Sequence, residues 1–107
     1  TMEQKDFFTL SAEALEHIDA RLGGLELDEL DVQLAGDVLT PSFKAGARFV
    51  INAHSAAGQI WMAAGTTAWH FDFVPEQRRW VAKKSADELM ATVARVVGAK
   101  LGTEVSL

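Results

Sequence analysis

The two ends of the chain space their apolar residues three and four positions apart, whereas the middle alternates apolar and polar residues. The first spacing is typical of an amphipathic helix and the second of a half-buried strand. In the first segment the apolar stripe consists of Phe7, Leu10, Ala14, Leu15, Ile18 and Leu22. Gly23 and Gly24 follow this stripe, and glycine commonly ends a helix. The pattern therefore predicts a helix that ends at these glycines.

The second helix is predicted to open with Ser85-Ala86-Asp87-Glu88. This segment has the form of a capping box, in which a serine oxygen accepts from an amide of the first turn and a glutamate reaches back. The face that follows consists of Leu89, Val93, Val96 and Val97, with the stem of Lys100 beside them. Gly102 is expected to end the helix.

Strand-like alternation is found in six segments of the middle region, at 30–34, 38–44, 47–53, 58–63, 68–73 and 79–82. The connections are short, and Gly36-Asp37 is a tight-turn signal, so an antiparallel meander is expected. Pro41 lies inside the second strand and cannot donate a ladder hydrogen bond, which predicts a bulge or a locally broken pairing. The predicted fold class is α+β, with two helices packed on one face of an antiparallel sheet of five or six strands.

Alternation also divides the strand residues between the two faces of this sheet. The face toward the helices should carry Leu30, Val32, Leu34, Leu39, Phe43, Phe49, Ile51, Ile60, Met62, Trp69 and Phe71. The opposite face, which no helix remains to cover, collects Asp31, Gln33, Thr40, Arg48, Val50, Asn52, Gln59, Trp61, His70 and Asp72. Trp61 should then be largely exposed, because antiparallel sheets can leave one face in water.

An aromatic side chain among amide and charged groups resembles the anchor of a protein interface. We therefore predict a partner-binding surface formed by Arg48, Asn52, Gln59, Trp61 and His70. The alternative is that a neighbouring loop folds over Trp61 and removes it from solvent.

Composition narrows the class of protein. The chain has 107 residues, 49% hydrophobic and 23% charged, which suits one globular domain over residues 1–107. Thr1, which precedes Met2, is interpreted as an addition to the natural sequence. The absence of cysteine excludes disulfides, thiolate metal sites and cysteine nucleophiles. No apolar run approaches the roughly 18 residues of a membrane span, so neither a membrane partner nor a signal peptide is expected.

Charge is distributed unevenly along the chain. Residues 1–37 contain ten acidic and two basic residues, a net charge of −8, whereas residues 38–107 contain five acidic and eight basic residues, a net charge of +3. An acidic end argues against binding to nucleic acid, which requires a positive surface. It favours a cation or a basic protein surface as partner, although a solvated surface that serves solubility alone has the same composition.

The acidic residues supply candidate metal ligands in two groups. Glu13, Glu16 and Asp19 share a strip of the first helix at three-residue steps. Glu26, Asp28, Glu29 and Asp31 follow in the next loop and the first strand. Carboxylates are hard ligands that suit iron, Mn²⁺, Mg²⁺ or Ca²⁺, and an open strip without a cage predicts weak, partly hydrated binding. His17 is a candidate accessory ligand, or simply an exposed residue.

Several stretches together resemble the frataxin family, in particular its bacterial CyaY-type members. These are LDVQLAGDVLT at 30–40, FVINAHSAAGQIWMA at 49–63 and WHFDF at 69–73, followed by Arg79-Trp80. The resemblance extends over about residues 6–102. It implies an α-β-α sandwich with a solvent-facing sheet, and Asn52, Gln59 and Trp61 match binding positions of the family.

The resemblance also implies a role. Frataxins bind iron and attach to the iron–sulfur cluster assembly machinery, through a cysteine desulfurase and a scaffold protein, and modulate cluster formation. The acidic ridge is the metal-binding and partner-facing part in that family. This chain departs from the pattern at Gly23-Gly24 and Gln33, which thin the ridge, and at His54, where the family commonly has glutamine.

Three functions are compatible with these residues. The first is an iron-binding modulator of cluster assembly, mostly monomeric and located in a bacterial cytoplasm. The second is a metal-independent adaptor of the same machinery that uses the Trp61 face and the acidic charge. The third is an enzyme, such as an iron oxidase; it ranks lowest because the sequence has no nucleophile elbow, phosphate loop or Ser-His-Asp arrangement.

Overall fold

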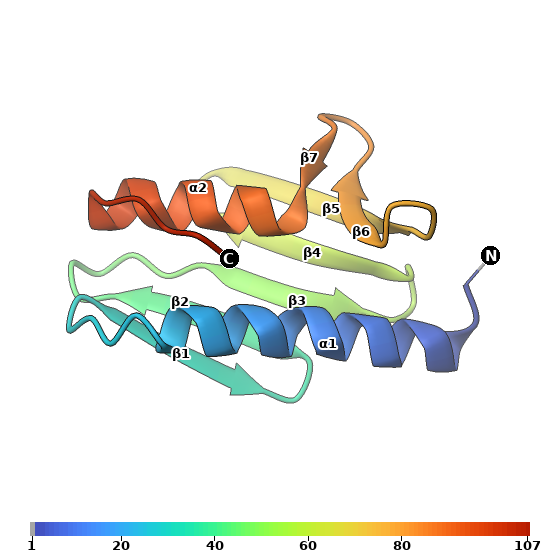
Figure 1. Cartoon of the computed structure of the whole chain (residues 1–107), viewed down its shortest axis with the longest axis horizontal. Coiled ribbons are helices and arrows are strands. Elements are labelled where there is room, and N and C mark those ends of the chain that lie inside the picture. Colours follow the sequence, from blue (N-terminus) through green and yellow to red (C-terminus); the bar gives the residue numbers. More distant parts are fainter. Residues whose placement is uncertain (1) are drawn as a thin grey trace.

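The computed structural model describes residues 2–107, and Thr1 lies outside the described residues. The elements in order are α1 Gln4–Gly23, β1 Leu30–Ala35, β2 Val38–Phe43, β3 Val50–His54, β4 Gln59–Ala64, β5 Thr67–Val74, β6 Arg79–Ala82, β7 Asp87–Glu88 and α2 Leu89–Leu101. Each strand pairs antiparallel with the next, so the spatial order β1 to β7 follows the chain. The expected α+β meander is confirmed (Figure 1).

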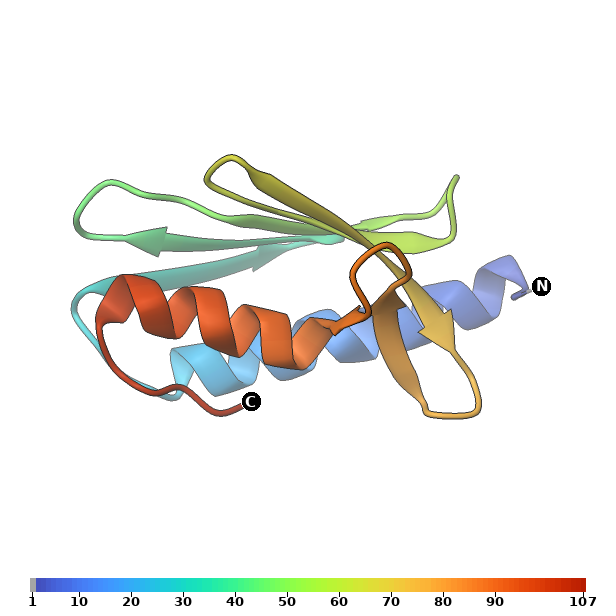
Figure 2. The same ribbon diagram turned by 90° about the horizontal axis from the view of Figure 1, so that it is seen from above.

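The molecule has two layers. Figure 2 shows the sheet in one layer and both helices in the other, with the hairpin of β5 and β6 curling toward the helices. The apolar stripes of α1 and α2 meet the helix-facing side chains of the sheet; the centre consists of Leu15, Ile18, Leu22, Leu39, Ile51, Ile60, Met62, Phe71, Leu89, Val93 and Val97, each at most 2% exposed. Burying such side chains is the main stabilising contribution to the fold.

The number of strands is higher than expected. The sheet contains seven strands rather than five or six, because Asp87 and Glu88 pair with Ala82 and Val81 as a two-residue strand. A strand of two residues carries no period that alternation could reveal. The third strand also begins later than expected, at Val50 rather than residue 47, since Arg48 forms an isolated bridge with Ser42.

Pro41 interrupts one of its two neighbouring ladders. The β1–β2 register is continuous through the Val32 and Pro41 pair. On the other side the Pro41 carbonyl accepts from Phe49 N–H at 2.9 Å, whereas assigned β2–β3 pairing is confined to Val38 and Leu39. In an antiparallel sheet the N–H and C=O groups of one residue point toward the same neighbouring strand. Because the Pro41 carbonyl points toward β3, the N–H that proline lacks would also have pointed toward β3. The locally broken pairing is thus confirmed, without a bulge toward β1.

The start of α2 differs from the predicted capping box. The helix begins at Leu89, and Glu88 is its N-cap residue, with side-chain oxygens that accept from the Met90 and Ala91 amides at 2.8 and 3.0 Å. Ser85 instead lies in the turn between β6 and β7, where its hydroxyl accepts from Asp87 N–H. The prediction of a capping box was wrong because Asp87 and Glu88, expected in the first turn of the second helix, form β7 instead.

Glycine permits a close approach at the end of α2. A Cβ at Gly98 would lie 2.8 Å from the carbonyl oxygen of Thr103, because the chain turns back over the helix after Gly102, which has φ 70°. The returning segment places Val105 against the core, 9% exposed. Within residues 2–107 neither helix has the length and hydropathy needed to cross a bilayer.

Replacing Gly98 by Ala is expected to lower the free energy of unfolding by about 1–3 kcal/mol, the usual cost of overpacking. Helix propensity acts in the opposite direction and favours Ala by about 1 kcal/mol, so a net loss reports the steric contact. Urea unfolding measures the effect. Gly23→Ala is the matched control, since its Cβ meets no atom within 4 Å; the account fails if Gly98→Ala is as stable as this control.

Candidate functional site

The side chain of Trp61 is held by a hydrogen-bonded relay on the sheet face that the helices leave open. Its Nε1–H donates to Oε1 of Gln59 at 2.8 Å, and Nε2 of Gln59 donates to Oδ1 of Asp72 at 3.2 Å. A tryptophan N–H that is partly buried requires such an acceptor. Gln59 therefore stands next to Trp61 on this face because it satisfies the indole and fixes its orientation.

Two imidazole rings cover the faces of the same indole. The His54 ring stacks at a centroid distance of 3.7 Å and an interplanar angle of 13°, and the His70 ring stacks at 4.3 Å and 14°. We refer to His54, Gln59, Trp61, His70 and Asp72 as the ring platform. Aromatic pairs of this kind contribute about 0.5–1.5 kcal/mol beyond their buried area, so the stacks add to the order that Gln59 imposes.

The strand register explains why these five residues meet. Trp61 of β4 lies between Asn52 of β3 and His70 of β5. His54 pairs with Gln59, one step of the pleat further along. Residues two apart on a strand share a face, and directly opposite or diagonal neighbours lie within reach of large side chains. Side chains of β3, β4 and β5 that share one face thus meet at the indole of Trp61.

The prediction that Trp61 is largely exposed was wrong. The side chain is partly buried, because the His54 and His70 rings cover its faces. The sequence analysis placed Asn52, Gln59 and His70 around Trp61. It assigned Asp72 to the same face without including it in the partner-binding surface, and it left out His54. For His54 the available signal was the period of two, which puts it on the face of Asn52.

The Ala57 amide sits against the His54 ring. It donates to the His54 carbonyl oxygen at 3.2 Å and to Nδ1 of the ring at 3.3 Å. A neutral imidazole that accepts at one nitrogen carries its proton on the other. Nε2–H of His54 is therefore a hydrogen-bond donor at the edge of the ring platform.

Arg48 lies apart from this cluster. It is exposed at the bridge with Ser42, before β3 begins, and the structure does not bring it into the relay or the stacks. Trp80 is buried against Phe7 and Phe73, as expected of a core residue.

Trp69, expected in the core, is only partly buried and donates through Nε1–H to Oδ2 of Asp87 at 3.0 Å. This bond ties β5 to β7. Hydrogen bonding by the Ser85 side chain, and then by Trp69, holds the pKa of Asp87 below its ordinary value of 3.8.

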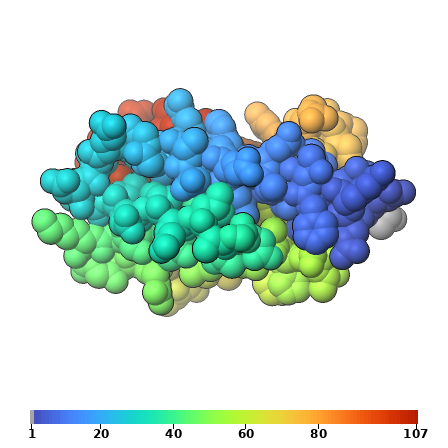
Figure 3. Space-filling view, turned by 90° about the horizontal axis from the view of Figure 1, so that it is seen from below, coloured from blue at the N-terminus to red at the C-terminus, as the bar shows by residue number. Residues whose placement is uncertain are grey.

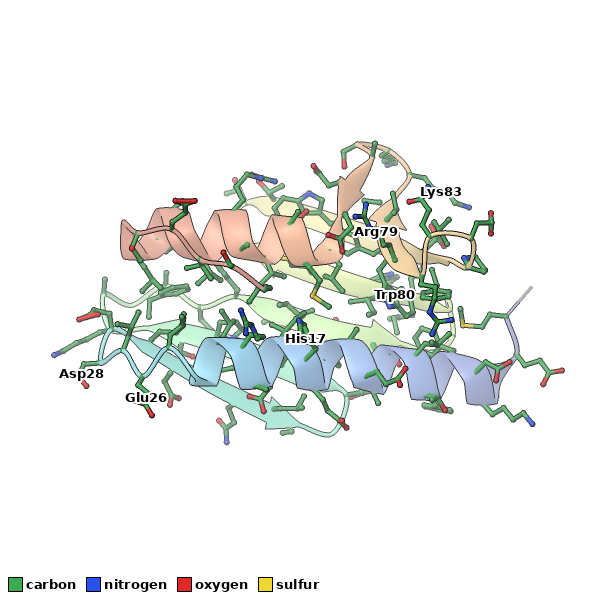
Figure 4. The ribbon with its side chains drawn as sticks, viewed as in Figure 1. His17, Glu26, Asp28, Arg79, Trp80 and Lys83 are labelled. Atoms are coloured by element: carbon green, nitrogen blue, oxygen red, sulfur yellow. The ribbon has the colours of Figure 1, made fainter. Side chains whose placement is uncertain are left out.

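The seven acidic candidates lie on α1, the connection after it and β1, three elements that Figure 3 shows next to one another on one face. All are exposed except Asp19, which is partly buried. Figure 4 shows Glu26 and Asp28 at the outer end of the connection. Within residues 2–107 no three histidine or acidic side chains converge as a ready-made metal site, so the acids form a spread surface. We call Glu13, Glu16, Asp19, Glu26, Asp28, Glu29 and Asp31 the acidic surface.

His17 contacts the C-terminal segment and does not join these acids as a shared set of metal ligands. Its Nε2 lies 3.4 Å from the Leu107 carbonyl oxygen, and Arg21 donates to the Ser106 carbonyl at the same distance. This flank of α1 therefore contacts the C-terminal segment.

Comparison with known proteins places these features in a family context. A family model described as a frataxin-like domain matches residues 1–103. A curated relative, the iron-sulfur cluster assembly protein CyaY of Pseudomonas fluorescens (strain Pf0-1), is 29% identical over 104 residues, which cover 97% of this chain and 94% of the relative. A solved structure of frataxin from Psychromonas ingrahamii matches with a TM-score of 0.89 at 20% identity and covers 98% of this chain and 97% of that chain. At that identity the structural match concerns the fold.

Removing the indole acceptor tests the relay. Gln59→Ala is expected to lower the free energy of unfolding by about 1 kcal/mol, the net value of a typical hydrogen bond, and to loosen the stacking of Trp61. Urea unfolding measures the first effect, and the NMR line width of the Trp61 indole N–H measures the second. Gln33→Ala, an exposed glutamine on β1 of the same face, is the control; equal effects of the two substitutions would refute the relay.

Proposed function

The chain belongs to the frataxin family, in its bacterial CyaY-type branch, and on this premise we propose that it acts in iron–sulfur cluster assembly. In this proposal it is a non-enzymatic protein that binds iron weakly and modulates assembly by attaching to a cysteine desulfurase and its scaffold protein. Iron is cargo or signal rather than a resident cofactor.

The ring platform is the observation that carries the partner-binding half of the proposal. An ordered aromatic residue loses little conformational freedom when a partner covers it, and such preorganisation favours affinity. Trp61 has its N–H bonded by Gln59 and both faces stacked. Asn52 lies beside it on β3. Asn52, Gln59 and Trp61 are the residues that match binding positions of the frataxin family in the sequence. They supply a rigid anchor on a face of the sheet that no helix covers.

The acidic surface supports the iron-binding half. Seven carboxylates on neighbouring elements create a negative potential that concentrates cations and a basic protein surface. Their oxygens are suitable ligands for ferrous and ferric iron. Because they do not converge, a bound ion would keep much of its water, which favours exchange with a partner over permanent storage.

Pull-down with the cysteine desulfurase and scaffold complex, with and without iron, tests the proposal. Trp61→Ala is expected to weaken capture about thirtyfold, as for a hot-spot residue. Phe8→Ala removes an aromatic ring that is 54% exposed on α1 and serves as its control. Unchanged capture by Trp61→Ala would reject the role of the ring platform.

A second set of variants tests the acidic surface in the same assay. The combined change Glu13→Gln, Glu16→Gln and Asp19→Asn should reduce capture, and more strongly at low salt because exposed charges are screened. The control neutralises Asp37, Glu76 and Glu104, three exposed acids outside the acidic surface, so that both sets remove the same number of charges. If both sets reduce capture equally, net charge rather than the acidic surface determines binding.

A metal-independent adaptor is the second candidate, and the spread of the carboxylates favours it. The two functions separate in an iron titration followed by amide NMR. Iron-specific shifts confined to residues 13–31 support iron binding, whereas an unresponsive acidic surface together with Trp61-dependent capture supports the adaptor.

A further inference from the structure

The two edges of the sheet differ in length. β7 closes one edge with only Asp87 and Glu88 and leads directly into α2. β1 forms the other edge with six residues, Leu30–Ala35, and pairs only with β2. Figure 1 shows β1 as the outermost strand, and Figure 3 shows this part of the chain on the surface. A long edge without proline or a bulge is a template for another strand, and β1 contains neither.

Pro41 reveals which backbone groups of β1 face outward. Its carbonyl accepts from the Phe49 amide on the β3 side at 2.9 Å, so its partner in the ladder, Val32, belongs to a pair without hydrogen bonds. The Lys44 amide donates to the Glu29 carbonyl at 2.8 Å, which gives the same alternation three residues away. The odd-numbered residues of β1 therefore bond to β2. The residues whose N–H and C=O groups point to the open edge are Leu30, Val32 and Leu34.

Most of these outward groups have no partner within the chain. The Leu30 amide donates to the Leu27 carbonyl in the preceding turn. Among residues 2–107, no backbone bond outside the β1–β2 ladder engages the amide of Val32 or Leu34. The edge thus presents N–H and C=O groups at every second residue. This spacing matches the backbone of an extended chain, and a strand that adds to a sheet edge binds through such groups.

The side chains of β1 restrict the kind of strand that fits this edge. Toward the helix layer Leu30, Val32 and Leu34 are only partly buried, so an added strand with apolar residues on that face would extend the core. The opposite row begins with Glu29 and Asp31, which are both exposed. Basic side chains directly across from this row complement it. The matching segment therefore alternates apolar and basic residues.

A second copy of the chain fits the same edge less well. Pairing two β1 strands would bring two acidic surfaces side by side, and residues 1–37 carry a net charge of −8 in each copy. Lys44 lies next to Glu29 at one end of the row and offsets only part of this charge. Like charges brought together oppose association. Charge complementarity therefore selects a basic occupant.

We propose that the open edge of β1 binds an extended segment of a protein partner by strand addition, and that apolar and basic residues alternate along this segment. The inference rests on the proposed function, since it specifies how a basic partner attaches to the acidic surface. Backbone bonds to Val32 and Leu34 would set the register, and Asp31 would select the charge.

The probe is a short peptide that alternates valine and lysine, and the readout is amide hydrogen exchange in the unaltered protein. The Val32 and Leu34 amides should exchange rapidly in the free protein and about tenfold more slowly at saturating peptide, because they gain hydrogen-bond acceptors. The Gln33 amide already bonds to β2 and should change much less. Equal slowing at all three amides, or none, would overturn the proposal.

Two control peptides separate backbone pairing from charge. N-methylation of two adjacent central residues retains the charge and removes a donor from each edge of the peptide, so binding should weaken about tenfold. A peptide that alternates valine and glutamate retains the donors and reverses the charge, and its binding should be weaker still. If the methylated peptide binds as well as its parent, charge alone attracts the peptide and the strand site is rejected.

A variant locates the effect on the edge. Val32→Pro removes an outward amide and leaves the β1–β2 ladder intact, because Val32 belongs to a pair without hydrogen bonds and proline is tolerated in edge strands. Peptide binding, measured by anisotropy, should weaken about tenfold. Val32→Thr retains the amide and the branched shape and serves as the matched control. Unchanged binding by Val32→Pro, or equal losses in the two variants, contradicts the proposal.

Two further outcomes identify a different occupant or a failure of the proposed function. Exchange of Val32 and Leu34 that slows with rising protein concentration, without peptide, would mean that a second copy occupies the edge and would overturn the proposal. Absence of alternate protection, with intact Trp61-dependent capture of the desulfurase, rejects this inference alone. Alternate protection without that capture supports the strand site and rejects the proposed function.

Discussion

The structure is governed by one constraint: both helices cover the same face of the sheet, so the other face must satisfy its own polar and aromatic groups. Between the helices and the covered face, apolar side chains such as Ile18, Ile51 and Phe71 are fully buried, and their burial stabilises the fold. On the open face, the indole N–H of Trp61 needs an acceptor, and Gln59 supplies it. The stacked imidazoles exclude water from the ring faces. Stabilising the open face and preparing it for a partner are therefore the same physical arrangement.

The two charged regions of the molecule follow from chain order. The acids are concentrated in residues 1–37, which form α1, the connection and β1 at one edge of the meander. Eight of the ten basic residues come later, and four of them, Arg78, Arg79, Lys83 and Lys84, lie at β6 and the turns that flank it, near the other edge of the meander. Because a meander keeps neighbours in sequence close in space, an uneven distribution along the chain becomes a separation of charge across the molecule. Such a separation can orient a protein on a charged partner before contacts form.

Periodicity was sufficient to predict the layers, the meander and the core, because both helices and all long strands have one apolar side. It failed where an element is too short to have a period, as at β7, and where a helix start competes with a strand, as at Ser85 and Glu88. The site was predicted in part for a similar reason. Alternation assigns residues to a face, which placed Gln59 and His70 with Trp61. It does not describe the direction in which a ring leans, and His54 reaches the indole diagonally across the ladder.

The central claim is that the side chains of the sheet hold Trp61 in one orientation before any partner binds. Nuclear Overhauser contacts in the free protein test this most directly. The account predicts contacts from the indole protons of Trp61 to the ring protons of both His54 and His70, together with a slowly exchanging indole N–H. An indole that shows contacts to neither imidazole and exchanges its N–H freely with water would contradict it.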